Sequence, residues 1–68
     1  MIAKTAYDFA AKTAQYQAFT PAQLAYSLTD AIKAREAMRG WNPAAENWYA
    51  DDVATIAQVQ RRAARVSA

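Results

Sequence analysis

The 68-residue sequence contains no cysteine, no histidine, one glycine and two prolines. Without cysteine the chain can form no disulfide and no thiolate metal site. Without histidine it lacks the commonest general base, the commonest metal ligand and the side chain that usually titrates near neutral pH. We therefore expect no metal and no cofactor.

The sequence also lacks long hydrophobic runs. No stretch approaches the roughly 20 apolar residues of a membrane-spanning helix, and the first residues contain no apolar run of the signal-peptide type. We therefore expect a cytoplasmic protein that does not associate with a membrane. The net charge of +2 is too small to indicate an anionic partner by itself.

The length predicts one small domain, residues 1–68. A single core of this size supplies only about 3–5 kcal/mol of stability, and small domains often add disulfides, metals or oligomerisation. Since the first two are excluded, we predict a homodimer. Hydrophobic residues make up 54% of the chain, but many are alanine, which favours helix and buries little area.

A strong helix start lies at Phe19–Leu24. Thr20 suits the N-cap position and Pro21 the first helical position. Gln23 stands three residues after Thr20, the spacing of a capping box, and Phe19 and Leu24 have the spacing of a hydrophobic staple. This combination predicts a helix that begins at residue 21.

A second boundary lies at Gly40–Pro43. Gly40 can take the left-handed conformation that ends a helix, while Asn42 can cap the next helix and Pro43 can open it. The sequence therefore predicts an all-α fold with helices at about 3–18, 21–39 and 43–65. Because the second connection is short, the last two helices should form an antiparallel hairpin.

Apolar residues recur at spacings of three and four in each predicted helix. The first helix has no strong cap, and Tyr7 lies off its stripe, which consists of Ile2, Ala6, Phe9, Thr13 and Tyr16. Folding at the second boundary brings the other two stripes into register and pairs Ile32 with Val53, Leu28 with Ile56 and Leu24 with Val59. The predicted core or dimer residues are Leu24, Leu28, Ile32, Val53 and Ile56.

No catalytic group is evident. Asp51 and Asp52 are adjacent and would point about 100° apart on a helix, so we interpret them as a solvated face near the helix start, where negative charge is favourable. Ser27 has no histidine to activate it, and a single glycine excludes a glycine-rich phosphate loop. We predict no catalytic residue and no enzyme activity.

Two groups of side chains have the chemistry of a binding surface. Aromatic residues near the hairpin turn can close the end of a thin core or form an interaction hot spot. Arginines near the C-terminus, with no acidic residue after Asp52, complement the helix dipole or contact phosphate or an acidic protein. The predicted partner-binding residues are Trp41, Trp48, Tyr49, Arg61, Arg62 and Arg65.

The segment Thr20–Leu28, followed by the Trp48-Tyr49 pair, resembles small helical-hairpin accessory proteins of temperate bacteriophages and related mobile elements. That group includes anti-activators that bind host regulators. The resemblance covers residues 20–65, and residues 1–19 depart from the pattern. It implies a dimeric binding protein without catalytic activity and assigns no individual functional residue.

The leading hypothesis is a non-catalytic protein-interaction module that binds and modulates a larger host or regulatory protein, with inhibition as one form of modulation. The first alternative is a small nucleic-acid-binding protein, in which dimerisation brings six arginines to one surface. The second alternative is a structural or assembly subunit of a larger complex.

Overall fold

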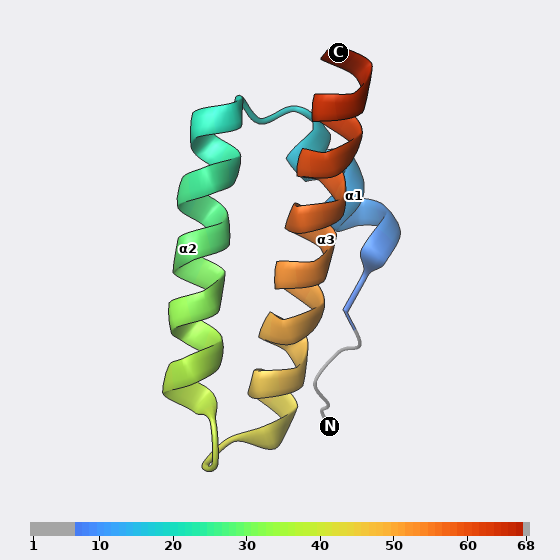
Figure 1. Cartoon of the computed structure of the whole chain (residues 1–68). Helices are drawn as coiled ribbons and strands as arrows, with labels where there is room; N and C mark the ends of the chain where they lie inside the picture. The colour runs from blue at the N-terminus through green and yellow to red at the C-terminus, as the bar shows by residue number, and fades with distance from the viewer. Residues whose placement is uncertain (1–6, 68) are drawn as a thin grey trace.

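The computed structural model describes the backbone of residues 7–67 and the side chains of residues 7–65. Within this range the chain forms three helices, α1 (Phe9–Gln17), α2 (Pro21–Met38) and α3 (Pro43–Ser67). Helices α2 and α3 pack side by side as an antiparallel hairpin, and the short α1 contacts α3 (Figure 1). The predicted all-α hairpin with an additional N-terminal helix is confirmed.

Helix α1 is shorter than predicted and has the cap that the sequence analysis missed. It begins at Phe9, because the Asp8 side chain accepts a hydrogen bond from the backbone N–H of Ala11 at 3.0 Å. An aspartate in this position satisfies an N–H that the first turn leaves free. The predicted stripe residues Ile2 and Ala6 lie outside the described residues.

The start of α2 forms as the sequence predicts. The N–H of Gln23 donates to the Thr20 hydroxyl at 3.1 Å, and the Gln23 side chain accepts from the Thr20 N–H at 2.8 Å. This reciprocal pair is a complete capping box.

The turn between α2 and α3 also follows the prediction. Gly40 has a φ of 79°, the left-handed conformation that other residues adopt only with strain. The N–H groups of Trp41 and Asn42 then donate to the carbonyl of Met38, which satisfies an acceptor at the helix end. The Asn42 side chain caps α3 by accepting from the N–H of Ala45 at 3.1 Å.

The core lies where the three helices meet along α3. Ile56 is fully buried at its centre, and Leu24, Leu28 and Val53 belong to or pack against the same cluster. Ile32 retains 37% of its surface and lies outside this cluster. The predicted residues therefore divide into a buried pair, Leu24 and Ile56, two half-buried residues, and one exposed residue.

The stripe predicted for the first helix is only partly correct. Tyr16 is buried, whereas Phe9 is 53% exposed because it stands at the first turn of a helix that is short. Tyr7, which the periodicity placed off the stripe, is only 8% exposed. It lies before α1 begins, so helical periodicity does not govern where its side chain points.

Candidate functional site

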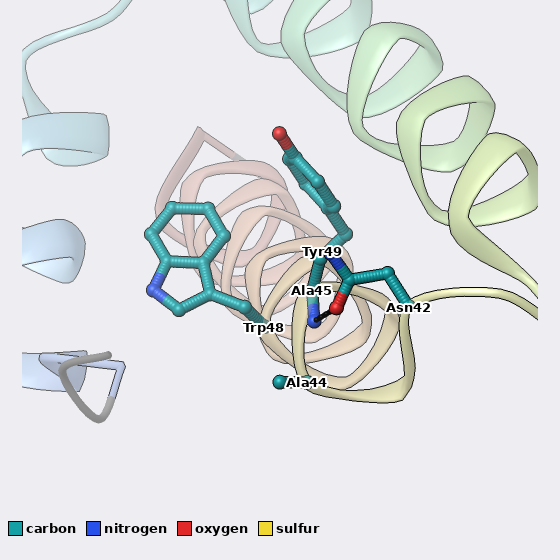
Figure 2. Close-up of a pocket in the computed structure, with 5 residues that line it drawn as sticks. All are labelled: Asn42, Ala44, Ala45, Trp48 and Tyr49. Atoms are coloured by element: carbon teal, nitrogen blue, oxygen red, sulfur yellow. Dashed lines mark hydrogen bonds between the residues drawn. The ribbon is translucent and has the colours of Figure 1, made fainter. Parts of the chain in front are cut away.

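A pocket of about 390 Å³ opens at the turn end of the hairpin. It is lined by residues of the first two turns of α3 and by the asparagine that caps them (Figure 2). Trp48 and Tyr49 point in two different directions from α3, with Ala45 between them and Ala44 on the other side of Trp48 (Figure 2); we call the two alanines the floor of the pocket. Two alanines leave the space that larger side chains would fill. The lining is Asn42, Ala44, Ala45, Trp48 and Tyr49.

The Trp48 wall of the pocket is packed against two aromatic rings and a lysine. Trp48 meets Tyr49 edge to face at 5.4 Å between ring centroids and meets Tyr7 in the same way at 4.8 Å. The ammonium of Lys12 lies 5.4 Å from the Trp48 ring, a distance at which a cation is attracted to the ring face. The Trp48 wall therefore depends on the segment around α1.

Trp41, by contrast, is 78% exposed and stands in the turn directly before Asn42. The sequence analysis left open whether the aromatic group closes the core or forms a binding surface. The structure places Trp48 and Tyr49 half-buried and leaves Trp41 in solvent. Trp41 therefore has no packing role in the described part of the chain.

A charged cluster links the two helices beside this turn. The Arg39 guanidinium lies 3.2 Å from the Glu36 carboxylate on its own helix and 3.7 Å from Glu46 on α3. Arg35 adds a contact of 3.5 Å to Glu36. The short turn therefore brings Arg39 at the end of α2 within reach of Glu46 of α3. These side chains are partly solvated, so each pair stabilises the turn by at most about 1 kcal/mol.

The sequence analysis missed a polar cluster behind Trp48. Asp52 is only 6% exposed, and it accepts hydrogen bonds from the Tyr7 hydroxyl at 2.5 Å and the Tyr16 hydroxyl at 2.9 Å. The interpretation of Asp52 as part of a solvated face is wrong, because α1 and the segment before it cover this side of α3. Buried charge is tolerated only when such partners satisfy it.

The two tyrosines respond electrostatically to this environment. Burial raises the pKa of both Tyr7 and Tyr16 above the usual value for tyrosine, and the hydrogen bond to Asp52 raises each pKa further. Both hydroxyls therefore remain protonated donors at neutral pH. The Tyr7–Asp52–Tyr16 cluster therefore binds the N-terminal part of the described chain to α3.

One signal in the sequence points to this cluster. Asp52 stands four residues after Trp48 and four before Ile56, so it occupies the same row of α3 as two packed side chains. An acid in such a row needs donors, and tyrosine hydroxyls are suitable donors. The sequence does not show which of the four tyrosines supply them, because those contacts join residues 36 and 45 positions apart.

The predicted partner-binding residues fall into two separate groups. Arg61, Arg62 and Arg65 are exposed on the last turns of α3, and a helix rises about 1.5 Å per residue. Arg65 is 17 residues from Trp48, which places it roughly 25 Å along the helix from the aromatic pocket. The structure therefore does not bring the arginines and the aromatic residues into one site.

A second pocket, of about 290 Å³, lies at the arginine end of the hairpin between the start of α2 and α3. Its lining includes Phe19, Leu24 and Gln60. In the part of the chain that the structure describes, no group of three acidic side chains could hold a metal ion. None of the described helices is long and apolar enough to cross a membrane.

Comparison of the chain with protein families, with characterised proteins and with solved structures finds no match.

Proposed function

We propose that the protein is a non-catalytic interaction module that binds a larger protein through the turn end of its hairpin. The observation that carries this proposal is an exposed tryptophan, Trp41, directly before Asn42, which lines a pocket together with Trp48 and Tyr49. Tryptophan and tyrosine contribute disproportionately to binding energy at protein interfaces. An exposed tryptophan with no packing role is a typical anchor for such a contact.

The geometry indicates what kind of group the pocket would accept. Its volume of about 390 Å³ is at the small end of the range for binding pockets, so it suits one or two side chains of a partner. The aromatic walls and alanine floor favour an apolar or aromatic group, and the side chain of Asn42 lies at the edge. Binding there would modulate, for example inhibit, the larger protein, as the resemblance to phage accessory proteins implies.

Trp41→Ala is the variant that tests the proposal. Because Trp41 is exposed, its removal should leave the helical circular dichroism and the thermal midpoint unchanged. The matched control is Tyr26→Ala, since Tyr26 is 75% exposed on α2 and also loses a ring. Trp48→Ala is less suitable, because Trp48 packs against Tyr7.

The assay is an affinity pull-down from host lysate with and without nuclease, read by mass spectrometry, followed by titration of the recovered protein. We expect one protein in near-equal amount that Tyr26→Ala retains and that Trp41→Ala binds at least about 30-fold more weakly, the cost of losing a hot-spot residue. Equal binding by both variants would contradict the assignment of this surface.

Nucleic-acid binding is the second candidate, favoured by one observation. Arg61, Arg62 and Arg65 are exposed, and the ion pairs of the described residues involve other arginines. This candidate predicts an affinity for DNA or RNA that falls steeply with salt, because each phosphate contact releases counterions. Loss of all recovered proteins after nuclease treatment would favour it over the interaction module. Recovery of one large stoichiometric assembly would instead favour a structural subunit.

A further inference from the structure

Within residues 7–67, one broad side of the hairpin carries no third helix. In Figure 1, α1 passes behind α3, on the other side of α2 and α3 from the viewer. At 100° per residue, Ala50, Val53 and Ala57 lie about 60–120° around α3 from the buried Ile56, on the flank away from Asp52 and α1. On α2, Leu28 and Ile32 lie on the flank that adjoins them. We call these five residues the open face.

The open face has an apolar centre. Leu28, Val53 and the two alanines are half-buried, and Ile32 is 37% exposed. Each of these side chains touches its neighbours on one side and solvent on the other. A second layer of helices would remove the remaining apolar surface from water, and the small alanines would let those helices approach closely.

The two ends of the hairpin differ in charge. At the turn end, Glu36 and Glu46 balance Arg35 and Arg39. At the other end stand three arginines, and the sequence contains no acidic residue after Asp52. If two copies paired in the same direction, the arginine end of one would lie beside the arginine end of the other. Six arginines would then be close together, and like charges at an interface are unfavourable.

We propose that two copies of the chain pair through the open face in the opposite orientation, with the turn end of one copy over the arginine end of the other. The two-fold axis then crosses the hairpin near Ile32 and Val53, so that α2 packs on α2 and α3 on α3. Glu46 and Arg61 lie seven residues before and eight residues after Val53. This symmetry therefore places Glu46 of each copy beside Arg61 of the other.

The area available fits a dimer of modest affinity. The 18 residues of α2 are about 27 Å long, and two helices side by side are about 20 Å wide. The open side of the hairpin thus offers on the order of 550 Å² per copy, close to the lower limit of about 600 Å² per partner for stable interfaces. We therefore expect an equilibrium between monomer and dimer that shifts with concentration.

Sedimentation of the whole chain tests the pairing. The wild-type protein should change from the mass of one chain, 7.5 kDa, to twice that mass as its concentration rises from micromolar to millimolar. Ile32→Asp should remain monomeric over this range, because it buries a charge at the axis. Tyr26→Asp should dimerise like the wild type, because Tyr26 is 75% exposed and lies about 120° around α2 from Ile32.

The helical circular dichroism of both variants should match that of the wild type, since both positions are exposed in the monomer. If Ile32→Asp is less helical, Ile32→Lys and Ile32→Ser provide the same comparison. A wild-type protein that stays monomeric at millimolar concentration would overturn the proposal. So would a dimer that Tyr26→Asp disrupts and Ile32→Asp does not.

A spin label at Arg65→Cys tests the orientation, since the chain has no other cysteine. Residue 65 is 12 residues from Val53, so the two labels should lie about 35 Å apart along the dimer. Copies with the same ends together would bring the labels within about 20 Å of one another. That short distance would overturn the proposed symmetry and would create the six-arginine surface of the nucleic-acid candidate. Trp41 lies outside the open face, so this test and the pull-down fail independently.

Discussion

Replacement of Asp52 by alanine should destabilise this protein severely. The carboxylate is 6% exposed and is the acceptor for two buried hydroxyls, those of Tyr7 and Tyr16. Asp52→Ala removes the carboxylate to which both hydroxyls donate. Because an unsatisfied buried donor costs about 1–3 kcal/mol, the expected loss is about 2–6 kcal/mol.

That loss is comparable with the whole stability of the domain. A core of this size supplies about 3–5 kcal/mol, so Asp52→Ala should be largely unfolded at 25 °C. Tyr16→Phe should be milder, about 1.5–3 kcal/mol for one hydrogen bond to a charged group, because Tyr7 still donates to the carboxylate. Urea unfolding followed by circular dichroism, at one fixed protein concentration, measures the loss in Tyr16→Phe. The helical circular dichroism of Asp52→Ala without urea shows how much of that variant is folded.

The triple variant Asp52→Leu with Tyr7→Phe and Tyr16→Phe separates hydrogen bonding from packing. It replaces every member of the cluster by an apolar group of similar shape, a change that is often close to neutral. We therefore expect it to be more stable than Asp52→Ala by several kcal/mol. If Asp52→Ala costs less than about 0.5 kcal/mol, the carboxylate is solvated and the reasoning is refuted.

Two further predictions concern alkaline pH and the turn. Since the pKa of Tyr7 and of Tyr16 is raised in the folded state, their contribution to stability is complete below the unfolded tyrosine pKa of about 10 and is lost as pH rises toward the folded pKa values. The free energy of unfolding should fall above pH 10 by about 1.4 kcal/mol per pH unit for each tyrosine, and a urea midpoint that stays constant from pH 9 to 12 would contradict this. Gly40→Ala should lower the free energy of unfolding by about 1 kcal/mol, because Gly40 has a φ of 79°. Nothing lies within 4 Å of the position of an added Cβ, so the whole cost is conformational strain. Thermal unfolding of Gly40→Ala beside Gly40→Asn, which tolerates this conformation better, measures it, and an unchanged midpoint for Gly40→Ala would show that the turn can rearrange.

Local chemistry in the sequence was enough to predict the helices of the hairpin. Thr20, Gln23, Gly40 and Asn42 act on backbone groups within four residues of themselves, so their roles can be derived without knowing the rest of the fold. The start of α1 was the exception. Asp8 is an equally local cap, and it was missed because the apolar periodicity was extended back to residues outside the described range.

The candidate site was predictable only in part. Trp48 and Tyr49 were singled out by residue type, and they do line a pocket. Their separation from Arg61, Arg62 and Arg65 followed from helix length. The different exposure of Trp41 and Trp48 could not be predicted from the sequence, because it depends on the contact that Tyr7 makes with Trp48 across the fold.

The sequence by itself determined the two helices of the hairpin and the turn between α2 and α3, because capping and helix-ending signals act over a few residues. Only the tertiary structure decided that Asp52 is buried, that Tyr7 and Tyr16 donate to it, and that α1 leaves one side of the hairpin uncovered among the residues that the structure describes. These features depend on where α1 docks against α3, and docking is set by contacts between residues far apart in the chain, which no local pattern encodes.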